Sequence, residues 1–266
     1  MPIAIQFAAY LAANGYHPRS SEHSNFQSEL IVSDLIGHCP LIARRAATGE
    51  IVAKLRHKQM VAGNDWVIDI AIGTCAGSPT PPQSGALITF AQPVIIQIAI
   101  ELKSILTEHK KARRNRLRDF TAFHGHGHTY DPRTIVAAFL VVNSADYFYS
   151  PLNLGKDLLP NPAKRPELNT HFTNSRTARQ LAKESIDLFR TIHLRHSPSD
   201  QPGLEALGVS VVEHDNIGFY PDPTKYPTLQ KPTQAAPTPP RLSPGNPLSY
   251  HSMIQRICFA YGQRFP

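Results

Sequence analysis

The chain has 266 residues, of which 41% are hydrophobic, so it can bury a sizeable core and is not disordered throughout. Lysine and arginine (27) exceed aspartate and glutamate (20), which gives a formal net charge of +7. Three cysteines without a CxxC spacing exclude a disulfide framework. They predict a reduced, intracellular protein whose cysteines are ordinary core residues.

Two apolar stretches resemble targeting segments but lack their full pattern. No Lys or Arg precedes residues 2–14, whereas a secretory signal normally has a positive n-region. Residues 86–100 are interrupted by Gln92, Pro93 and Gln97 and fall short of the ~20 apolar residues of a membrane span. We therefore expect a cytoplasmic protein with no membrane contact.

The N-terminal third is expected to begin with helices. Residues 3–14 predict a helix, because apolar residues recur every four positions and Gly15 follows. A second helix is expected over residues 25–35, with Gly37 as its stop. Residues 40–63 fit either a helix or a strand.

The middle of the chain alternates strands and helices. We expect a strand over residues 67–72, a Pro-rich loop over 73–85 and a longer strand over 94–103. A basic helix over 104–124 follows. Residues 134–142 are almost continuously apolar, which is typical of a strand buried on both faces.

The last third is expected to be more irregular. Residues 151–173 predict a surface loop, residues 175–194 a helix and residues 208–213 a strand. Nine prolines fall within 221–247, so we expect an extended linker there with no core element. Residues 250–261 predict a short helix that docks back on the core.

The order of these elements predicts an α/β fold with a mixed central β-sheet flanked by helices and a Pro-rich C-terminal extension. Three parts are expected along the chain. Residues 1–220 form the main domain, 221–247 the linker, and 248–266 a short C-terminal helix or tail.

Two predicted strands carry charges on otherwise aliphatic surfaces. Because residues two apart on a strand share a face, Glu101 and Lys103 lie together, opposite the aliphatic face of their strand. Asp69 is likewise placed opposite the aliphatic face of the preceding strand. The expected aliphatic faces are Ile68, Ile70 and Ile72 in the first strand and Val94, Ile96, Ile98, Ile100 and Leu102 in the second.

If the aliphatic faces pack on the same side, Asp69, Glu101 and Lys103 converge on the other. Two carboxylates can hold Mg²⁺ while leaving water positions open. A neighbouring lysine can orient or deprotonate a water and stabilise charge on a phosphate. The pattern predicts a site for phosphodiester hydrolysis.

Asp69 followed by Glu101-Leu102-Lys103 at the end of an apolar strand resembles the signature of the restriction-endonuclease-like PD-(D/E)XK nucleases. The resemblance spans about residues 25–215, and Ile68 stands where the motif name has proline. It implies a restriction-endonuclease-like core in which Asp69 and Glu101 bind metal and Lys103 is the catalytic lysine.

The same resemblance implies the substrate and the cofactor. Members of this family cut double-stranded DNA with Mg²⁺, for which Mn²⁺ can substitute, and usually act as homodimers. A prokaryotic type II restriction enzyme or a related defence nuclease is the expected role. Glu29 matches the position of an additional metal-binding acid in many members, and Asp65 competes with Asp69 because both share a strand face.

The predicted basic helix carries most of the excess charge of the chain. Residues 103–118 contain seven cations against one acid, Glu108. Coming directly after the candidate metal site, these side chains favour contact with DNA phosphates over a merely solvated face. The expected DNA-binding residues are Lys110, Lys111, Arg113, Arg114, Arg116 and Arg118.

Two alternative functions depend on other observations. Alternate histidines at His124, His126 and His128 can chelate zinc, which allows a zinc hydrolase, although the intervening glycines favour a turn. A non-catalytic DNA-binding protein on a degenerate nuclease fold is the second alternative, and the intact Asp/Glu/Lys set argues against it.

Overall fold

The computed structural model describes residues 3–16, 21–106, 109–145, 148, 178–216, 234–236 and 239–266. The strands in these segments form one mixed sheet with the order β3-β1-β2-β4-β5-β6-β7. The strands are β1 (Ile51–Val61), β2 (Asn64–Thr74), β3 (Thr89–Phe90), β4 (Ile95–Ile105), β5 (Ile135–Asn143), β6 (Ala206–Glu213) and β7 (Gln234–Ala235).

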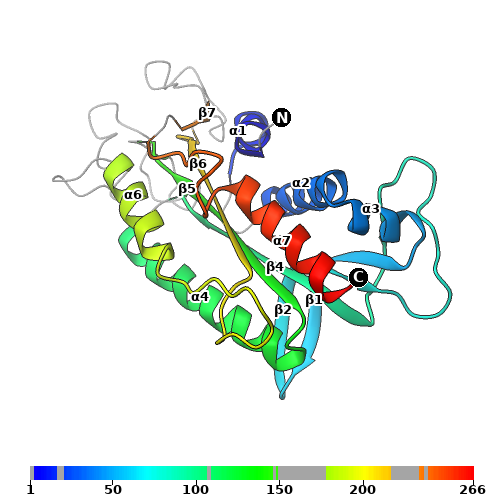
Figure 1. Ribbon diagram of the computed structural model, residues 1–266. Coiled ribbons are helices and arrows are strands. Elements are labelled where there is room, and N and C mark those ends of the chain that lie inside the picture. Colours follow the sequence, from blue (N-terminus) through cyan, green and yellow to red (C-terminus); the bar gives the residue numbers. More distant parts are fainter. Residues whose placement is uncertain are drawn as a thin grey trace.

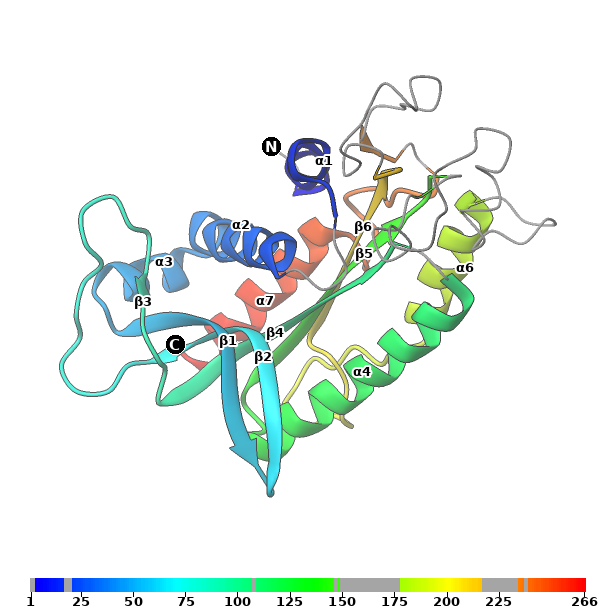
Figure 2. The same cartoon turned by 180° about the vertical axis from the view of Figure 1, so that it is seen from behind.

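Helices cover both faces of this sheet (Figures 1 and 2). One face carries α1 (Ile3–Asn14), α2 (Glu22–His38), α3 (Pro40–Ala47) and α7 (Tyr250–Arg264). The other face carries α4 (His109–Tyr130) and α6 (Ala178–Phe189). The prediction of an α/β fold with a mixed, helix-flanked sheet is confirmed.

The direction of the strands changes across the sheet. The neighbours β1, β2 and β4 are antiparallel, whereas β4, β5 and β6 are parallel. Parallel neighbours need a long crossover, and α4 provides it between β4 and β5. The charged end of β4 therefore lies between an antiparallel hairpin and the crossover helix.

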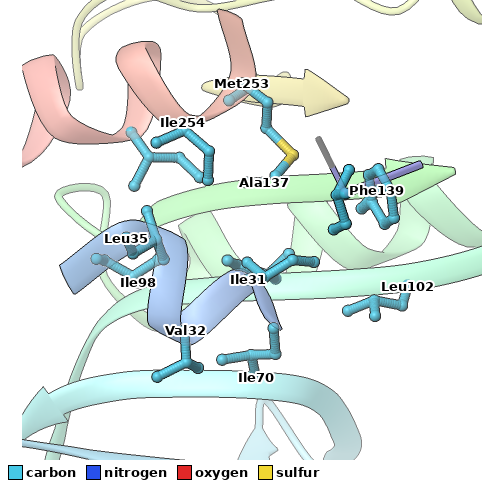
Figure 3. Close-up of a cluster of buried hydrophobic side chains, with 14 of the residues drawn as sticks. Ile31, Val32, Leu35, Ile70, Ile98, Leu102, Ala137, Phe139, Met253 and Ile254 are labelled. Carbon is cyan, nitrogen blue, oxygen red and sulfur yellow. The ribbon is translucent and has the colours of Figure 1, made fainter. Parts of the chain in front are cut away.

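Each face of the sheet packs on its own hydrophobic core. In Figure 3, α2, α7 and the strands β2, β4 and β5 bring side chains together in the first core. The second core lies under α4 and α6 and includes Trp66, Phe120, Phe123 and Phe189. Every residue of β5 is buried, which confirms the strand expected to be covered on both faces.

Two helix boundaries differ from the prediction. The second helix begins at Glu22, earlier than expected, and continues through Gly37 to His38. It stops at Cys39, whose extended backbone precedes Pro40, the first residue of α3. Proline cannot continue the preceding helix but fits the start of a new one. The ambiguous residues 40–63 contain both α3 and β1.

The turn expected at His124–His128 was wrong, because this segment belongs to α4. Gly127 faces the second core, where a Cβ atom would lie 2.5 Å from Val136 and 3.2 Å from Trp66. This glycine permits a close approach of the helix to the sheet. The helix ends at Tyr130, just before Asp131-Pro132.

The C-terminal part contributes to the sheet and to the first core. The linker prediction for 221–247 was wrong in one respect, because Gln234–Ala235 pairs with β6 and Ala236 is buried. Residues 221–233 and 237–238, like the loop expected at 151–173, lie outside the described residues. The short C-terminal helix is α7, which packs against β5 and β6 and confirms the expected docking.

A disulfide joins Cys39, at the junction of α2 and α3, to Cys258 in α7. The expectation that all three cysteines are ordinary unpaired core residues was wrong for Cys39 and Cys258; Cys75 is free. None of the helices within the described part of the chain is long and apolar enough to cross a membrane.

Candidate active site at the end of β4

The candidate site forms where the ladder between β2 and β4 stops. The last registered pair towards the end of β4 is Ile70 with Ile100. Beyond it, the Asp69 carboxylate replaces a backbone partner, because its Oδ2 accepts a hydrogen bond of 2.7 Å from the Leu102 amide. Asp69 therefore lies against the peptide unit that joins Glu101 to Leu102.

A change in backbone conformation accompanies this point of divergence. Arg56 stands opposite Asp69 in the β1–β2 hairpin and has a left-handed backbone, with φ of 52°. Such a conformation costs a non-glycine residue about 1–2 kcal/mol. On the two sides of Asp69, Ile68 packs in the second core and Ile70 packs in the first, although regular alternation would place both in the same core. The expectation of a single aliphatic face on this strand was therefore wrong at Ile68.

A register shift between β2 and β4 changes the faces in a similar way. It falls after Ile72, where Gly73 approaches the β4 backbone so closely that a Cβ atom would lie 1.8 Å from the Ile95 carbonyl oxygen. Only glycine fits there. As a result Ile96 packs in the second core, contrary to prediction, while Ile98 and its expected partners Ile100 and Leu102 share the first.

Glu101 and Lys103 lie together on the face of the sheet that α4 covers. Their registered partners on β5 are Ala138 and Leu140, which both belong to the second core. The Lys103 ammonium donates to Glu101 Oε1 in a close ion pair. The expected side-by-side placement of these two residues is confirmed.

Burial changes the acid–base properties of the site. It raises the pKa of the Asp69 carboxyl above its ordinary value, and the Leu102 amide and the charges of Lys103 and Arg56 oppose that rise. It also lowers the pKa of the Lys103 ammonium, and the charge of Asp69 opposes that fall. Both groups are therefore closer to exchanging a proton near neutral pH than they are in water.

The two carboxylates retain oxygens suited to a divalent cation. Asp69 Oδ1 and Glu101 Oε2 accept no hydrogen bond from any described residue. Mg²⁺ is commonly held by one or two carboxylates and keeps several waters, so this donor set fits it. Burial still disfavours the ionised form of Asp69 despite the Leu102 amide and the charges of Lys103 and Arg56, and a bound cation would favour that form.

The helix α4 adds charged groups that the sequence patterns did not place in the site. The charges of Asp119 and Arg116 both act on the pKa of Lys103. Arg116 pairs with Asp119 at 3.0 Å and donates from Nε to the Ser104 carbonyl oxygen. The alternation of residues along a strand does not predict which side chains of a crossover helix approach that strand. The sequence signal was the spacing of three residues between Arg116 and Asp119, which allows these two side chains to pair on a helix.

Two other acids lie elsewhere. Glu29 is exposed on α2, which covers the opposite face of the sheet, so its expected place beside the metal ligands was wrong. Asp65 is exposed and pairs with Met60 near the tip of the β1–β2 hairpin. Of the two candidate aspartates, only Asp69 reaches the Glu101–Lys103 segment.

Four of the six predicted DNA-binding residues lie on the exposed side of α4: Lys110, Lys111, Arg114 and Arg118. The other two are paired within the protein. Arg113 contacts Glu184 of α6 at 2.9 Å, and Arg116 contacts Asp119. The carboxylate partners expected for these half-buried cations are therefore present.

The exposed cations are not equally distant from the site. Lys111, Asn115 and Asp119 follow at intervals of four residues and form one stripe along α4. Arg118 joins this stripe, since its Nη2 donates to Asn115 Oδ1 at 2.6 Å. Around the helix axis, Lys111 and Arg118 therefore lie nearer to Asp119 than Lys110 does.

The histidines of α4 do not form a metal centre among the described residues. His128 lies one turn after His124, and its Nε2 hydrogen-bonds with the Gly203 carbonyl at 2.8 Å. Burial lowers the pKa of His128 to about 4. No group of three or more His, Cys, Asp or Glu side chains in the described segments is arranged to hold a metal ion.

Comparison with family models, with curated proteins and with solved structures finds no match for this chain.

Proposed function

We propose that the chain is a metal-dependent nuclease that hydrolyses phosphodiester bonds of double-stranded DNA. The observation that carries the proposal is the contact of the Asp69 carboxylate with the Leu102 amide. It joins an acid on one strand to the Glu-x-Lys segment on the next at the point where the strands separate. This contact supports the proposal that Asp69, Glu101 and Lys103 form one site, although Asp69 is far from the other two in sequence.

The arrangement of elements supports the same proposal. The segment from α3 to β5 contains the antiparallel neighbours β1, β2 and β4, the short strand β3, the crossover helix α4 and the strand β5, which is parallel to β4. The resemblance to PD-(D/E)XK nucleases implies a core of this kind, in which a helix, strands, a helix and a further strand follow one another.

The chemistry follows from the environment of each side chain. Asp69 and Glu101 would hold Mg²⁺ or Mn²⁺ through their free oxygens. When bound, such an ion supplies a Lewis acid at the scissile phosphate and makes a bound water more acidic. Lys103 then positions the attacking water, and its lowered pKa eases the transfer of a proton from that water.

The substrate follows from the charge around the site. The exposed stripe of Lys111 and Arg118 supplies cations to the phosphates next to the scissile one. Cutting both strands of a duplex requires two such sites, so we propose that the chain acts as a homodimer. A restriction or defence role is the function that best suits such a nuclease.

Two experiments test the proposal with independent readouts. The protein should nick and linearise supercoiled plasmid with Mg²⁺ or Mn²⁺ and stop in EDTA, and Asp69→Asn should abolish this. The same ions should raise the melting temperature of the wild type but not of Asp69→Asn. Asp65→Asn is the matched control, because it changes an exposed aspartate on the same strand.

The outcomes separate the proposal from its alternatives. Cleavage that persists in EDTA would refute it. Duplex binding without cleavage in Mg²⁺ and Mn²⁺ would identify a non-catalytic DNA-binding protein. Stoichiometric zinc that disappears on replacing His124 and His128 would identify a zinc enzyme.

A further inference from the structure

We propose that a pocket between α7 and the segment 195–205 binds a small organic anion that carries a phosphate or carboxylate group. The pocket has a volume of about 360 Å³. No residue of the Asp69 site lines it, and α7 covers the sheet face opposite α4 (Figure 2). Its lining includes Arg195, His196, Glu205, Gln255, Arg256 and Phe259.

The base of this pocket holds more positive than negative charge. Glu205 Oε1 lies 3.1 Å from Arg195 Nε and 2.9 Å from Arg264 Nη1. Arg256 donates from Nε to the Glu205 carbonyl oxygen at 2.8 Å. The Glu205 carboxylate therefore pairs with two guanidinium groups, and a third bonds the backbone carbonyl of the same residue. The side chains of Glu205 and Arg195 are each only 2% exposed.

Neighbouring groups do not cancel the excess of positive charge at the pocket. His128 lies 3.8 Å from Glu205, but burial lowers its pKa to about 4, so it is neutral at physiological pH. Asp200 attracts Arg195 electrostatically, yet its carboxylate is exposed and accepts the amides of His196 and Ser197. Buried cations without full compensation are costly, and a bound anion would offset that cost.

Hydrogen-bond donors remain for such a ligand. Neither Arg195 Nη1 nor Arg256 Nη1 bonds with a described residue, while their other nitrogens hold backbone or carboxylate oxygens. Guanidinium groups match the planar fork of carboxylate and phosphate oxygens. Two of the guanidinium groups that line the pocket therefore each keep one nitrogen without a partner among the described residues.

The rim of the pocket suits the organic part of the ligand. Phe259 is 67% exposed on α7, which is unusual for a large aromatic side chain. A ring or other apolar group of a ligand held by the guanidinium groups would cover it. We therefore expect phenyl phosphate to bind more tightly than inorganic phosphate.

Calorimetric titration of the full chain with these two probes tests the proposal without any enzymatic readout. Gln255→Glu adds a negative charge at the lip of the pocket, and Gln263→Glu adds the same charge to an exposed position of the same helix outside it. The first should weaken phenyl phosphate at least about fivefold, and the second less than about twofold. Phe259→Ser should reduce phenyl phosphate to the affinity of inorganic phosphate.

Two results would overturn the proposal. One is the absence of saturable one-to-one binding of either probe up to about 10 mM, which is weaker than a built site should show. The other is equal weakening by the two glutamate variants, which would report a general charge effect. Both results leave the nuclease proposal unaffected, since the two sites share no residue.

Discussion

Replacing Asp69 by asparagine should stabilise the fold while it removes the site for a divalent cation. Asparagine keeps the shape of the side chain and an oxygen that accepts the 2.7 Å hydrogen bond from the Leu102 amide. It removes only the charge, and that charge is what burial penalises in Asp69. Where burial disfavours the ionised form of an acid, the fold is more stable with a neutral residue of the same shape at that position.

The pH dependence gives this expectation its sign and scale. Because the folded pKa of Asp69 is raised above the ordinary value of 3.8, its contribution to stability is present below that value and is lost as pH rises through the folded pKa. The advantage of Asp69→Asn should therefore be absent at low pH and constant once Asp69 is ionised. Each unit by which the folded pKa exceeds the unfolded pKa corresponds to about 1.4 kcal/mol, so the gain in stability at pH 7 measures the size of that difference.

Urea unfolding of the wild type and the variant between pH 4 and 8 measures this difference, with Asp65→Asn as control. Added Mg²⁺ should stabilise the wild type but not the variant, because the proposed site needs the Asp69 carboxylate to hold the ion. At ten times the dissociation constant of the ion, the wild type should gain about 1.4 kcal/mol. Loss of stability in Asp69→Asn at every pH, or equal stabilisation of both proteins by Mg²⁺, would refute the reasoning.

Three further predictions concern single features of the molecule. Lys103→Met should lose cleavage but keep duplex affinity in Ca²⁺ within about threefold, because its ammonium pairs with Glu101; a parallel loss of binding would place it in DNA contact instead. Replacing Lys111 and Arg118 with alanine should lower the slope of log K against log salt by about 2, whereas Arg44→Ala on α3 should leave it unchanged. Thiol titration of the denatured, unreduced protein should find only Cys75, and three reactive thiols would show that Cys39 and Cys258 are unpaired.

The sequence predicted the layers of the fold because hydrophobic periodicity is a local property. The continuous apolar run of β5 and the alternation of Glu101 and Lys103 both have the faces expected of them. Their neighbours on the sheet decide only how deeply they are buried. The Asp69–Glu101–Lys103 group could be proposed from sequence for the same reason.

Face assignments failed where the backbone departs from regular alternation. Ile68 and Ile96 lie on unexpected faces because of the left-handed Arg56 and the register shift at Gly73. Arginine gives no local signal for a positive φ, and the close approach of Gly73 to Ile95 depends on a strand that comes later in the chain. Such irregularities also separate the strands near the candidate site.

Other failures have long-range causes. The helix through His124–His128 is held by packing of Gly127 on Trp66 and Val136, which overrides the low helix propensity of glycine. The pairing of Cys39 with Cys258 spans 219 residues and cannot be read from spacing. The charges of Asp119 and Arg116 reach Lys103 only because α4 crosses back over the sheet.

The cost of burying the charge of Asp69 helps to distinguish a structural role from a cation-binding role. A structural role at the end of a ladder requires only an acceptor for the Leu102 amide, which asparagine or serine supplies without burying a charge. The ion pair between Lys103 and Glu101 adds little net stability, because removing the two charges from water offsets their attraction. A purely structural site would therefore be more stable with neutral residues. Under the proposed function, a bound cation and a phosphate would together make Asp69, Glu101 and Lys103 favourable. The stability of the neutral variants with and without Mg²⁺ decides between these two accounts, independently of any DNA sequence that the protein recognises.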